Sequence, residues 1–233
     1  MKKLGLVGGI SWVSTIDYYR LINQGINARC GGLTFAQCVI ESLNFDDFTR
    51  NNTAGNWDAT YRLLADACAT LTGAGAEGIV LCANTAHAVS DRLEQELSVP
   101  LIHIVSATAS AITARGLTRV GLLGTKFTME LPFYRERLRH AGIEAMVPGR
   151  QETRDFIQRT IRDELGTGVC LPKTKAAYLT IIDELIAEGA EGIVLGCTEL
   201  PLLLSAADTT VPVFDTTQIH AAAAVDFALS EDS

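Results

Sequence analysis

Two cysteines are the residues of this chain best placed to do chemistry, because each follows the same seven-residue phrase. GAEGIVL occupies residues 75–81 and returns at residues 189–195, ahead of Cys82 and of Gly196-Cys197. The end of each copy is short, apolar and rich in β-branched residues, which is typical of a buried strand. Each thiol therefore falls at the carboxyl end of a strand, where open α/β sheets carry their reactive groups. The matched halves predict one site built twice, with a thiol on each side of a substrate.

Two opposed thiols suit the inversion of a carbon centre. One thiolate removes a proton from one face of the carbon, and the other thiol returns a proton to the opposite face. Fixed donors must stabilise the charge that develops on the carbon. We expect helix amino ends after both strands to supply those donors and to lower the thiol pKa from its reference value of about 8.5. The four remaining cysteines are predicted to be inert packing residues, namely Cys30, Cys38, Cys68 and Cys170.

Hydroxyl and amide side chains gather after the same predicted strands. With backbone N–H groups they favour an anion site suited to a carboxylate. The candidates are Ser11, Asn84, Thr85, Thr125 and Thr198. For any one of these residues taken alone, helix capping without a ligand is the favoured interpretation.

Three further residues near these strands are candidates for a role at the site. Gly9, in the pair Gly8-Gly9, indicates a backbone that approaches another group closely. Glu199, two residues after Cys197, is either a first-turn carboxylate or a group that orients the thiol. His87, five residues after Cys82, is a candidate for a supporting role.

The composition excludes several other classes of protein. With 233 residues and 48% hydrophobic content, the chain can form one large or two small domains. Its formal charge of −8 argues against nucleic acid or an anionic membrane surface as a partner, and no apolar run approaches the ~20 residues that span a bilayer. The glycines lack nucleotide-binding spacing and the cysteines and histidines lack metal-ligand spacing, so we expect no cofactor and no metal. Free thiols favour a reducing cytoplasm.

Strand-like and helix-like segments alternate along the chain, which predicts parallel strands joined by helical crossovers. The predicted strands are Leu4–Val7, Thr34–Ile40, Gly78–Leu81, Leu101–Ile104, Val120–Leu123, Gly192–Leu195 and Val211–Phe214. The predicted amphipathic helices are Asp58–Thr72, Lys173–Glu188 and Thr217–Leu229.

The duplication extends beyond the shared phrase. Residues 3–9 parallel residues 119–125, and the strand that follows Val99-Pro100 parallels the one that follows Val211-Pro212. This order favours an α/β fold of two pseudo-symmetric lobes with mostly parallel sheets and an active-site cleft between them. We expect residues 1–98 and 212–233 to form the first lobe and residues 99–211 to form the second.

Four motifs resemble those of the aspartate/glutamate racemase family of cofactor-independent amino-acid racemases. They are GLVGGISWVST near the start, LCANTAH at residues 81–87, GLLGTKFTM at 121–129 and GCTEL at 196–200. The resemblance implies two Rossmann-like lobes, a cleft holding both cysteines, no pyridoxal phosphate or metal, and a homodimer. It also implies that Ala83, Asn84 and Thr85 hold the substrate α-carboxylate. Cys82 would then be the base for one enantiomer and Cys197 for the other.

Departures from the family pattern point to its broad-specificity branch. Glutamate racemases of the family carry an Asp-Ser-Gly start and a histidine after GCT, which this chain lacks. Aspartate racemases of the family place an arginine and a lysine to pair with a side-chain carboxylate. This chain has Phe48 in place of the arginine and Gly166 or Thr167 in place of the lysine, with Arg50 and Lys173 nearby.

The sequence therefore predicts an amino-acid racemase that uses two cysteines on aspartate, glutamate or a broader set of amino acids. Two alternatives stay open. One is another enzyme of the same fold, such as hydantoin racemase, maleate isomerase or arylmalonate decarboxylase. The other is a non-catalytic protein that senses an amino acid.

Overall fold

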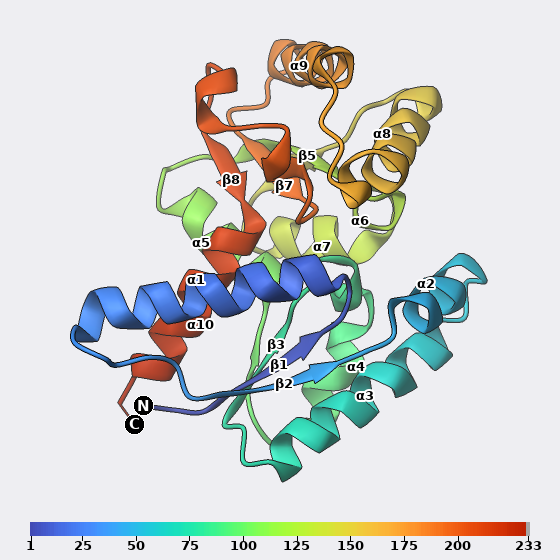
Figure 1. Cartoon of the computed structure of the whole chain (residues 1–233). Coiled ribbons are helices and arrows are strands. Elements are labelled where there is room, and N and C mark those ends of the chain that lie inside the picture. The colour runs from blue at the N-terminus through green and yellow to red at the C-terminus, as the bar shows by residue number, and fades with distance from the viewer. Residues whose placement is uncertain (232–233) are drawn as a thin grey trace. The chain divides into compact units, whose positions relative to one another are not determined.

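Two parallel four-stranded sheets form the framework of this chain, in a computed structural model that describes residues 1–231 (Figure 1). The chain divides into two units. The first comprises Met1–Ile104 together with the segment from Thr217 onward, and the second is Val105–Thr216. The α/β prediction with two parallel-sheet lobes is confirmed. Both units have the same strand order, in which the first strand lies between the second and the third.

The first unit has the strand order β2-β1-β3-β4. Its strands are β1 (Leu4–Gly8), β2 (Cys38–Ser42), β3 (Gly78–Leu81) and β4 (Leu101–Ile102). Its helices are α1 (Trp12–Cys30), α2 (Phe45–Thr53), α3 (Trp57–Gly73), α4 (Ser90–Glu96) and α10 (Thr216–Leu229), with a 3₁₀ turn η1 (Thr85–Val89). Side chains alternate along the strands, so α1 and α10 pack on one face of the sheet and α3 and α4 on the other (Figure 1).

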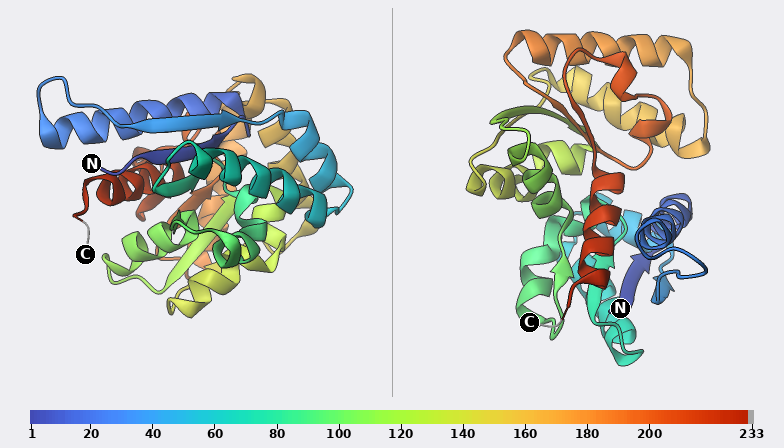
Figure 2. Two further views of the ribbon diagram at one scale, coloured as in Figure 1. Left: turned by 90° about the horizontal axis from the view of Figure 1, so that it is seen from below. Right: turned by 90° about the vertical axis from the view of Figure 1, so that its left-hand side faces the viewer.

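The second unit repeats this arrangement with the order β6-β5-β7-β8. Its strands are β5 (Arg119–Gly124), β6 (Glu144–Met146), β7 (Ile193–Gly196) and β8 (Val213–Asp215). Its helices are α5 (Ile104–Thr113), α6 (Lys126–Glu130), α7 (Pro132–His140), α8 (Gln151–Asp163) and α9 (Pro172–Ala187), with 3₁₀ turns η2 (Leu165–Thr167), η3 (Leu200–Leu202) and η4 (Ala206–Asp208). Figure 2 shows α8 and α9 on one face of this sheet, and both contribute to a single apolar core against it.

The duplicated phrase has the same structural role in both units. Its first glycine ends the preceding helix, with a positive φ of 83° at Gly75 and 104° at Gly189, a conformation that favours glycine. Its glutamate accepts a hydrogen bond from the amide at the start of the neighbouring strand. Glu77 Oε2 lies 2.7 Å from the amide before β1, and Glu191 Oε2 lies 3.0 Å from the first amide of β5. The phrase therefore joins a helix, a turn and two strands. This structural role explains why the two copies have the same sequence, without any catalytic role for the phrase.

Most predicted elements are present, with bounds shifted by a few residues. Gly78–Leu81 is β3 as predicted, whereas β2 begins at Cys38 rather than Thr34 and the short edge strand β6 was not anticipated. The unit boundaries fall a few residues after the expected positions 98 and 211. The reason is that β4 and β8 each pair with the strand before them, so each belongs to the preceding sheet.

Two kinds of feature are absent from residues 1–231. None of the helices in this range combines the length and apolar character needed to cross a membrane. Nor do these residues include a group of three or more His, Cys, Asp or Glu side chains arranged to hold a metal ion.

Candidate active site

The carboxyl edge of the first sheet brings together the candidate residues of the first unit. Gly9 follows β1, and Cys82 follows the neighbouring strand β3, where its amide donates to the carbonyl of Val7 at 2.9 Å. Gly9 has a φ of 81°, and a Cβ added there would lie 2.2 Å from the carbonyl oxygen of Leu43. The close backbone approach expected from Gly8-Gly9 is therefore present, and it is made to the loop after β2.

Ser14 links two of these candidates and was not anticipated. Ser11 is the extended N-cap residue of α1 and makes no capping hydrogen bond through its side chain. One turn later, the Ser14 hydroxyl lies 2.9 Å from the Ser11 carbonyl oxygen and 3.3 Å from that of Cys82. The first turn of α1 is thereby fixed to the residue that carries the thiol. The spacing S-x-x-S after a strand was the available signal for this contact.

Cys82 has an apolar environment. Its side chain has no exposed surface and packs in the core between the sheet and the helices α1 and α10. Its sulfur lies 3.8 Å from the carbonyl oxygen of Val80. Burial raises the pKa of the thiol far above its usual value. Ala83 and Asn84 are also buried, and Thr85, half-buried, begins the turn η1.

The second unit places its own candidates at the equivalent edge. Thr125 follows β5 and caps α6, with its hydroxyl oxygen 3.2 Å from the amide of Thr128. Cys197 follows the neighbouring strand β7. A Cβ added at Gly124 would lie 2.8 Å from the carbonyl oxygen of Gly196, so the two strand ends approach closely. Thr125 and Cys197 are thus on adjacent strand ends, as Gly9 and Cys82 are in the first unit.

Cys197 differs from Cys82 in having a carboxylate beside its sulfur. Cys197 Sγ lies 2.8 Å from Glu199 Oε2, and the hydroxyl of Thr198 donates to the same oxygen at 2.8 Å. Burial raises the pKa of the Cys197 thiol well above its usual range, and the negative charge of Glu199 raises it further. The backbone amides of Thr198 and Glu199 act in the opposite direction. Of the two interpretations of Glu199, this geometry favours a group that orients the thiol.

The two thiols belong to opposite faces of their sheets. Cys82 shares its core with Val80, whereas Cys197 shares its core with Ile193 and Leu195. Strand side chains alternate between faces, so one added residue moves a side chain to the other face. Gly196 is that added residue, because it separates the second phrase from its cysteine and has no counterpart in the first.

The predicted helix amino ends after the cysteines are wrong. A 3₁₀ turn follows each cysteine instead, η1 after Cys82 and η3 after Cys197. The predicted lowering of the thiol pKa is also wrong, because desolvation is the largest influence on both thiols and it raises the pKa. The local sequence shows the polar residues after each cysteine. It does not show how deeply the fold buries the sulfur, and this burial decides the direction of the pKa shift.

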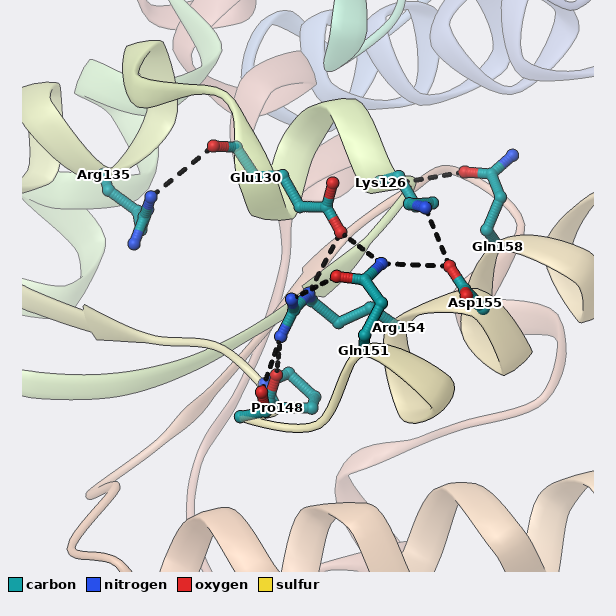
Figure 3. A network of polar contacts seen from close by, with 9 residues as sticks. Lys126, Glu130, Arg135, Pro148, Gln151, Arg154, Asp155 and Gln158 are labelled. Atoms are coloured by element: carbon teal, nitrogen blue, oxygen red, sulfur yellow. Dashed lines mark hydrogen bonds and ion pairs between the residues drawn. The ribbon is translucent and has the colours of Figure 1, made fainter.

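A polar network holds the segment that follows Thr125 (Figure 3). The amide of Lys126, the first residue of α6, donates to Gln158 Oε1 on α8 at 2.8 Å. At the other end of α6, Glu130 Oε1 accepts from Arg154 Nε at 3.0 Å. Both ends of this five-residue helix are therefore tied to α8, so the position of Thr125 is set by side chains more than 25 residues away along the chain.

The basic residues considered for a side-chain carboxylate are engaged elsewhere or exposed. Phe48 is buried in the core of the first unit. Arg50 is exposed on α2 and forms ion pairs with Asp46 and Asp47 of the same helix. Lys173 is exposed in the first turn of α9. Two surface grooves of about 580 and 670 Å³ lie in the second unit, and no cysteine lines either of them.

The sequence of this chain is similar to those of known racemases. A family model described as Asp/Glu/Hydantoin racemase matches residues 7–224. The broad specificity amino-acid racemase RacX of Bacillus subtilis is 28% identical over 180 residues, which cover 76% of this chain and 75% of that protein. A glutamate racemase of Koribacter versatilis is 30% identical over 194 residues, which cover 78% of this chain and 64% of that protein.

Solved structures extend the similarity to the whole fold. A protein from Yersinia pestis described as a candidate Asp/Glu racemase is 46% identical with a TM-score of 0.93, and the match covers 99% of this chain and all of that one. An aspartate racemase homologue from Pyrococcus horikoshii is 37% identical with a TM-score of 0.85 over the same shares. The resemblance seen in the sequence is confirmed. This chain belongs to the Asp/Glu/Hydantoin racemase family and is an isomerase.

Proposed function

We propose that this chain is an amino-acid racemase in which Cys82 and Cys197 are the two acid–base groups. The observation that carries the proposal is the placement of one thiol directly after the third strand of each duplicated sheet. A racemase needs proton transfer on both faces of the α-carbon, and two fixed groups accomplish it without moving. The scheme requires neither pyridoxal phosphate nor a metal ion.

Each turnover moves one proton onto the protein and one proton off it. The thiolate of one cysteine takes the α-proton, and the electron pair of the C–H bond remains on the substrate as a carbanion conjugated with its carboxylate. The thiol of the other cysteine then gives its proton to the opposite face. The enzyme ends with the ionisation of the two thiols exchanged, and is ready for the other enantiomer.

Glu199 gives Cys197 a local partner for its proton. The thiol of Cys197 donates to this carboxylate 2.8 Å away, and the negative charge of the carboxylate disfavours loss of the thiol proton. The raised pKa of this thiol makes its conjugate base stronger toward a weakly acidic carbon. We assign Glu199 the role of orienting this thiol and of strengthening its conjugate base through its negative charge.

The substrate carboxylate is assigned to the polar groups at the two strand edges. In the first unit these are the residues Ser11, Ala83, Asn84 and Thr85, beside the backbone of Gly9; in the second unit they are Thr125 and Thr198. Backbone amides and hydroxyls in such turns donate to anions, and the same donors stabilise the charge that develops on the carboxylate during proton removal.

The substrates we propose are amino acids with neutral side chains rather than aspartate or glutamate. Phe48 occupies the position where the resemblance led us to expect an arginine, and Arg50 is neutralised by two aspartates on its own helix. Neither position therefore supplies the paired cation that a buried acidic side chain requires.

Deuterium labelling tests the mechanism and the substrate class together. Purified protein is incubated in D₂O with single enantiomers of alanine, methionine, homoserine, aspartate and glutamate, and both enantiomers are analysed at early times by NMR and chiral separation. Two fixed bases place deuterium in the product enantiomer while the remaining substrate keeps its protium. A single base that serves both faces labels the two enantiomers alike.

Three results would contradict parts of this proposal. Equal early labelling of both enantiomers rules out two bases. Fast turnover of aspartate rules out the neutral-side-chain assignment and points to Arg50 or Lys173. A folded protein that turns over none of these amino acids is not an amino-acid racemase of this kind, and hydantoins are then the substrates to test, since the family description includes them.

We further propose that the enzyme acts as a homodimer in the cytoplasm. Trp12, Ile16 and Tyr19 form an exposed apolar stripe on α1, with exposed fractions of 67%, 54% and 50%, and such stripes mark contact surfaces. Sedimentation of wild type, Ile16→Lys and the control Leu33→Lys tests this. A dimer weakened by the first substitution alone supports the proposal, and a monomeric wild type contradicts it.

A further inference from the structure

Three of the four histidines form a buried cluster in the first unit. His87, His103 and His220 are exposed by 0%, 6% and 0%. The ring centroids of His87 and His103 lie 4.6 Å apart, and those of His87 and His220 lie 5.6 Å apart. His87 is thus in contact with both other rings. The acid–base scheme above uses none of them.

The hydrogen bonds of His87 fix its tautomer. The amide of Ile104 donates to Nε2 at 3.3 Å, so Nε2 carries the lone pair. Nδ1 therefore carries the proton, and it donates to the carbonyl oxygen of Ala83 at 3.0 Å. A doubly protonated ring would turn its Nε2–H toward the N–H of Ile104, which the geometry disfavours.

The two hydrogen bonds of His87 connect the loop after Cys82 with the end of the first unit. Ala83 is the residue after Cys82, and its carbonyl orients the loop that we assign to the substrate carboxylate. Ile104 is the last residue of the first unit before the chain enters the second. His87 thus ties the thiol loop to the point where the chain leaves the unit.

The other two histidines brace the same region without bonding to the Ala83 carbonyl. His220 accepts from the Tyr18 hydroxyl at Nδ1 (2.8 Å) and donates from Nε2 to the carbonyl of Ile102 (2.6 Å). His103 Nε2 lies 2.9 Å from the Ser90 hydroxyl, which donates to the carbonyl of His87 at 2.8 Å. The strands, turn and helices that meet here are therefore held together by hydrogen bonds to imidazole rings.

We propose that His87 is a positioning residue for racemisation, which sets the orientation of the Cys82 loop through the carbonyl of Ala83. The inference rests on the proposed function, since it assumes that Cys82 carries out proton transfer. His87 acts through the loop and has no contact with the reacting atoms in this scheme. A misplacement of about 1 Å at a reacting group can cost on the order of 100-fold in rate, which sets the size of the expected effect.

Two substitutions separate the two hydrogen bonds of His87. In His87→Asn, the side-chain amide reaches the position of Nδ1, so the bond to Ala83 is kept and the bond to Ile104 is lost. In His87→Gln, the amide oxygen reaches the position of Nε2, so the bond to Ile104 is kept and the bond to Ala83 is lost. His220→Gln is the matched control, because it removes an equally buried ring whose bonds go to Tyr18 and Ile102.

The readout is kcat for each folded variant, with the folded fraction taken from circular dichroism. We expect His87→Gln to lose about 100-fold in kcat, and His87→Asn to lose about fivefold, the equivalent of one neutral hydrogen bond. His220→Gln should lower the melting temperature and leave kcat unchanged. A merely structural role of His87 would instead lower the folded fraction and leave kcat of the folded molecules at the wild-type value.

The proposal is overturned by equal losses in the Asn and Gln variants, by wild-type kcat in His87→Gln, or by a loss in His220→Gln as large as in His87→Gln. If His87→Gln does not fold, ¹⁵N NMR of the histidine rings of the wild type decides. A proton on Nε2 of His87, rather than on Nδ1, contradicts the assigned bonds. Failure of the proposed function itself looks different, since wild type would then not racemise or Cys82→Ser would retain activity.

Discussion

Cys82 and Cys197 occupy equivalent places in a duplicated scaffold, yet the two sulfurs have different surroundings. Cys82 is packed in the core beside α1 and α10, and its sulfur lies near a backbone carbonyl. Cys197 is packed in the core beside α8 and α9, and a carboxylate lies 2.8 Å from its sulfur. The duplication preserved the strand order and the turn before each strand. The residues directly after each strand differ between the two units, and so does the chemical environment of the thiol.

The difference between the surroundings of the two thiols shows how a symmetric framework can support an asymmetric reaction. L- and D-amino acids present mirror-image faces, while a protein made of L-residues cannot present mirror-image groups. A single residue, Gly196, moves the second cysteine to the other face of its sheet. We infer that this register shift, and not the shared phrase, is what makes the two thiols inequivalent.

The largest expected effect tests whether both thiols are needed. Cys82→Ser and Cys197→Ser should each lower kcat by about 10³-fold, because a serine hydroxyl is too weak an acid to replace a thiol in proton transfer. Chiral chromatography of the product measures the loss. Cys68→Ser is the control, since Cys68 is a buried packing residue of α3 and should retain most of the activity. If either single variant racemised its substrate at the wild-type rate, the claim that both thiols are needed would be wrong.

A smaller effect should appear at Cys197 alone. Glu199→Gln should lower kcat by about 10²-fold, because the charge that makes the Cys197 thiolate a stronger base is lost. It should also lower the pKa of the Cys197 thiol, because the negative charge that helps to raise it is removed. Mass spectrometry after timed alkylation at pH 8 checks the second point. We expect faster labelling of Cys197 with an unchanged rate at Cys82, and equal changes at both thiols would show that Glu199 does not act locally.

The two units should also differ in their response to acid. Burial lowers the pKa of His220 to about 4, and this histidine lies in the first unit. Below the unfolded value of 6.5 the unfolded chain binds the proton and the folded one does not, so stability falls as pH drops from 6.5 to 4. The full loss is about 3 kcal/mol.

Tryptophan fluorescence is suited to this measurement, because both tryptophans, Trp12 and Trp57, lie in the first unit. Urea unfolding followed by fluorescence at pH 7.5 and pH 4.5 should show the loss, and His220→Gln should reduce it. The second unit has His140 as its single histidine, and it is exposed. An identical acid response in His220→Gln and wild type would assign the effect to other groups.

The smallest expected effect is one that the two units should share. Gly75→Ala and Gly189→Ala should each reduce the free energy of unfolding by about 1 kcal/mol, because both glycines have positive φ. Gly73→Ala, in the last turn of α3 with open space around it, should not destabilise and is the control. Urea titration measures all three. A large difference in the free energy of unfolding between Gly75→Ala and Gly189→Ala would mean that the shared phrase does not have the same structural role in both units.

The sequence was sufficient for the framework and for the candidate thiols. The identical phrases, their β-branched ends and the cysteines after them led to the two parallel sheets and to both strand edges. Gly9 could be anticipated because a close backbone approach requires glycine. These features are local in sequence, so their signals are contained in short stretches of residues.

The sequence was insufficient wherever long-range packing decides the outcome. The direction of the thiol pKa depends on how deeply the fold buries Cys82 and Cys197, which no neighbouring residue reveals. The short edge strand β6 has no apolar run to mark it. The contacts of Ser14 with the Cys82 carbonyl and of His87 with the Ile104 amide join residues that only the tertiary fold brings together.

The place of α10 in the core also has a consequence for biosynthesis. This helix supplies Ala221, Ala224 and Val225 to the core that contains Leu4 and Leu6 of β1. The ribosome makes it after the whole of Val105–Thr216. At ~5–20 residues per second, the part of this face that α1 does not cover waits on the order of 10 s for α10. During that interval the second unit can already be complete, while the unit begun first still exposes the apolar surface that α10 covers.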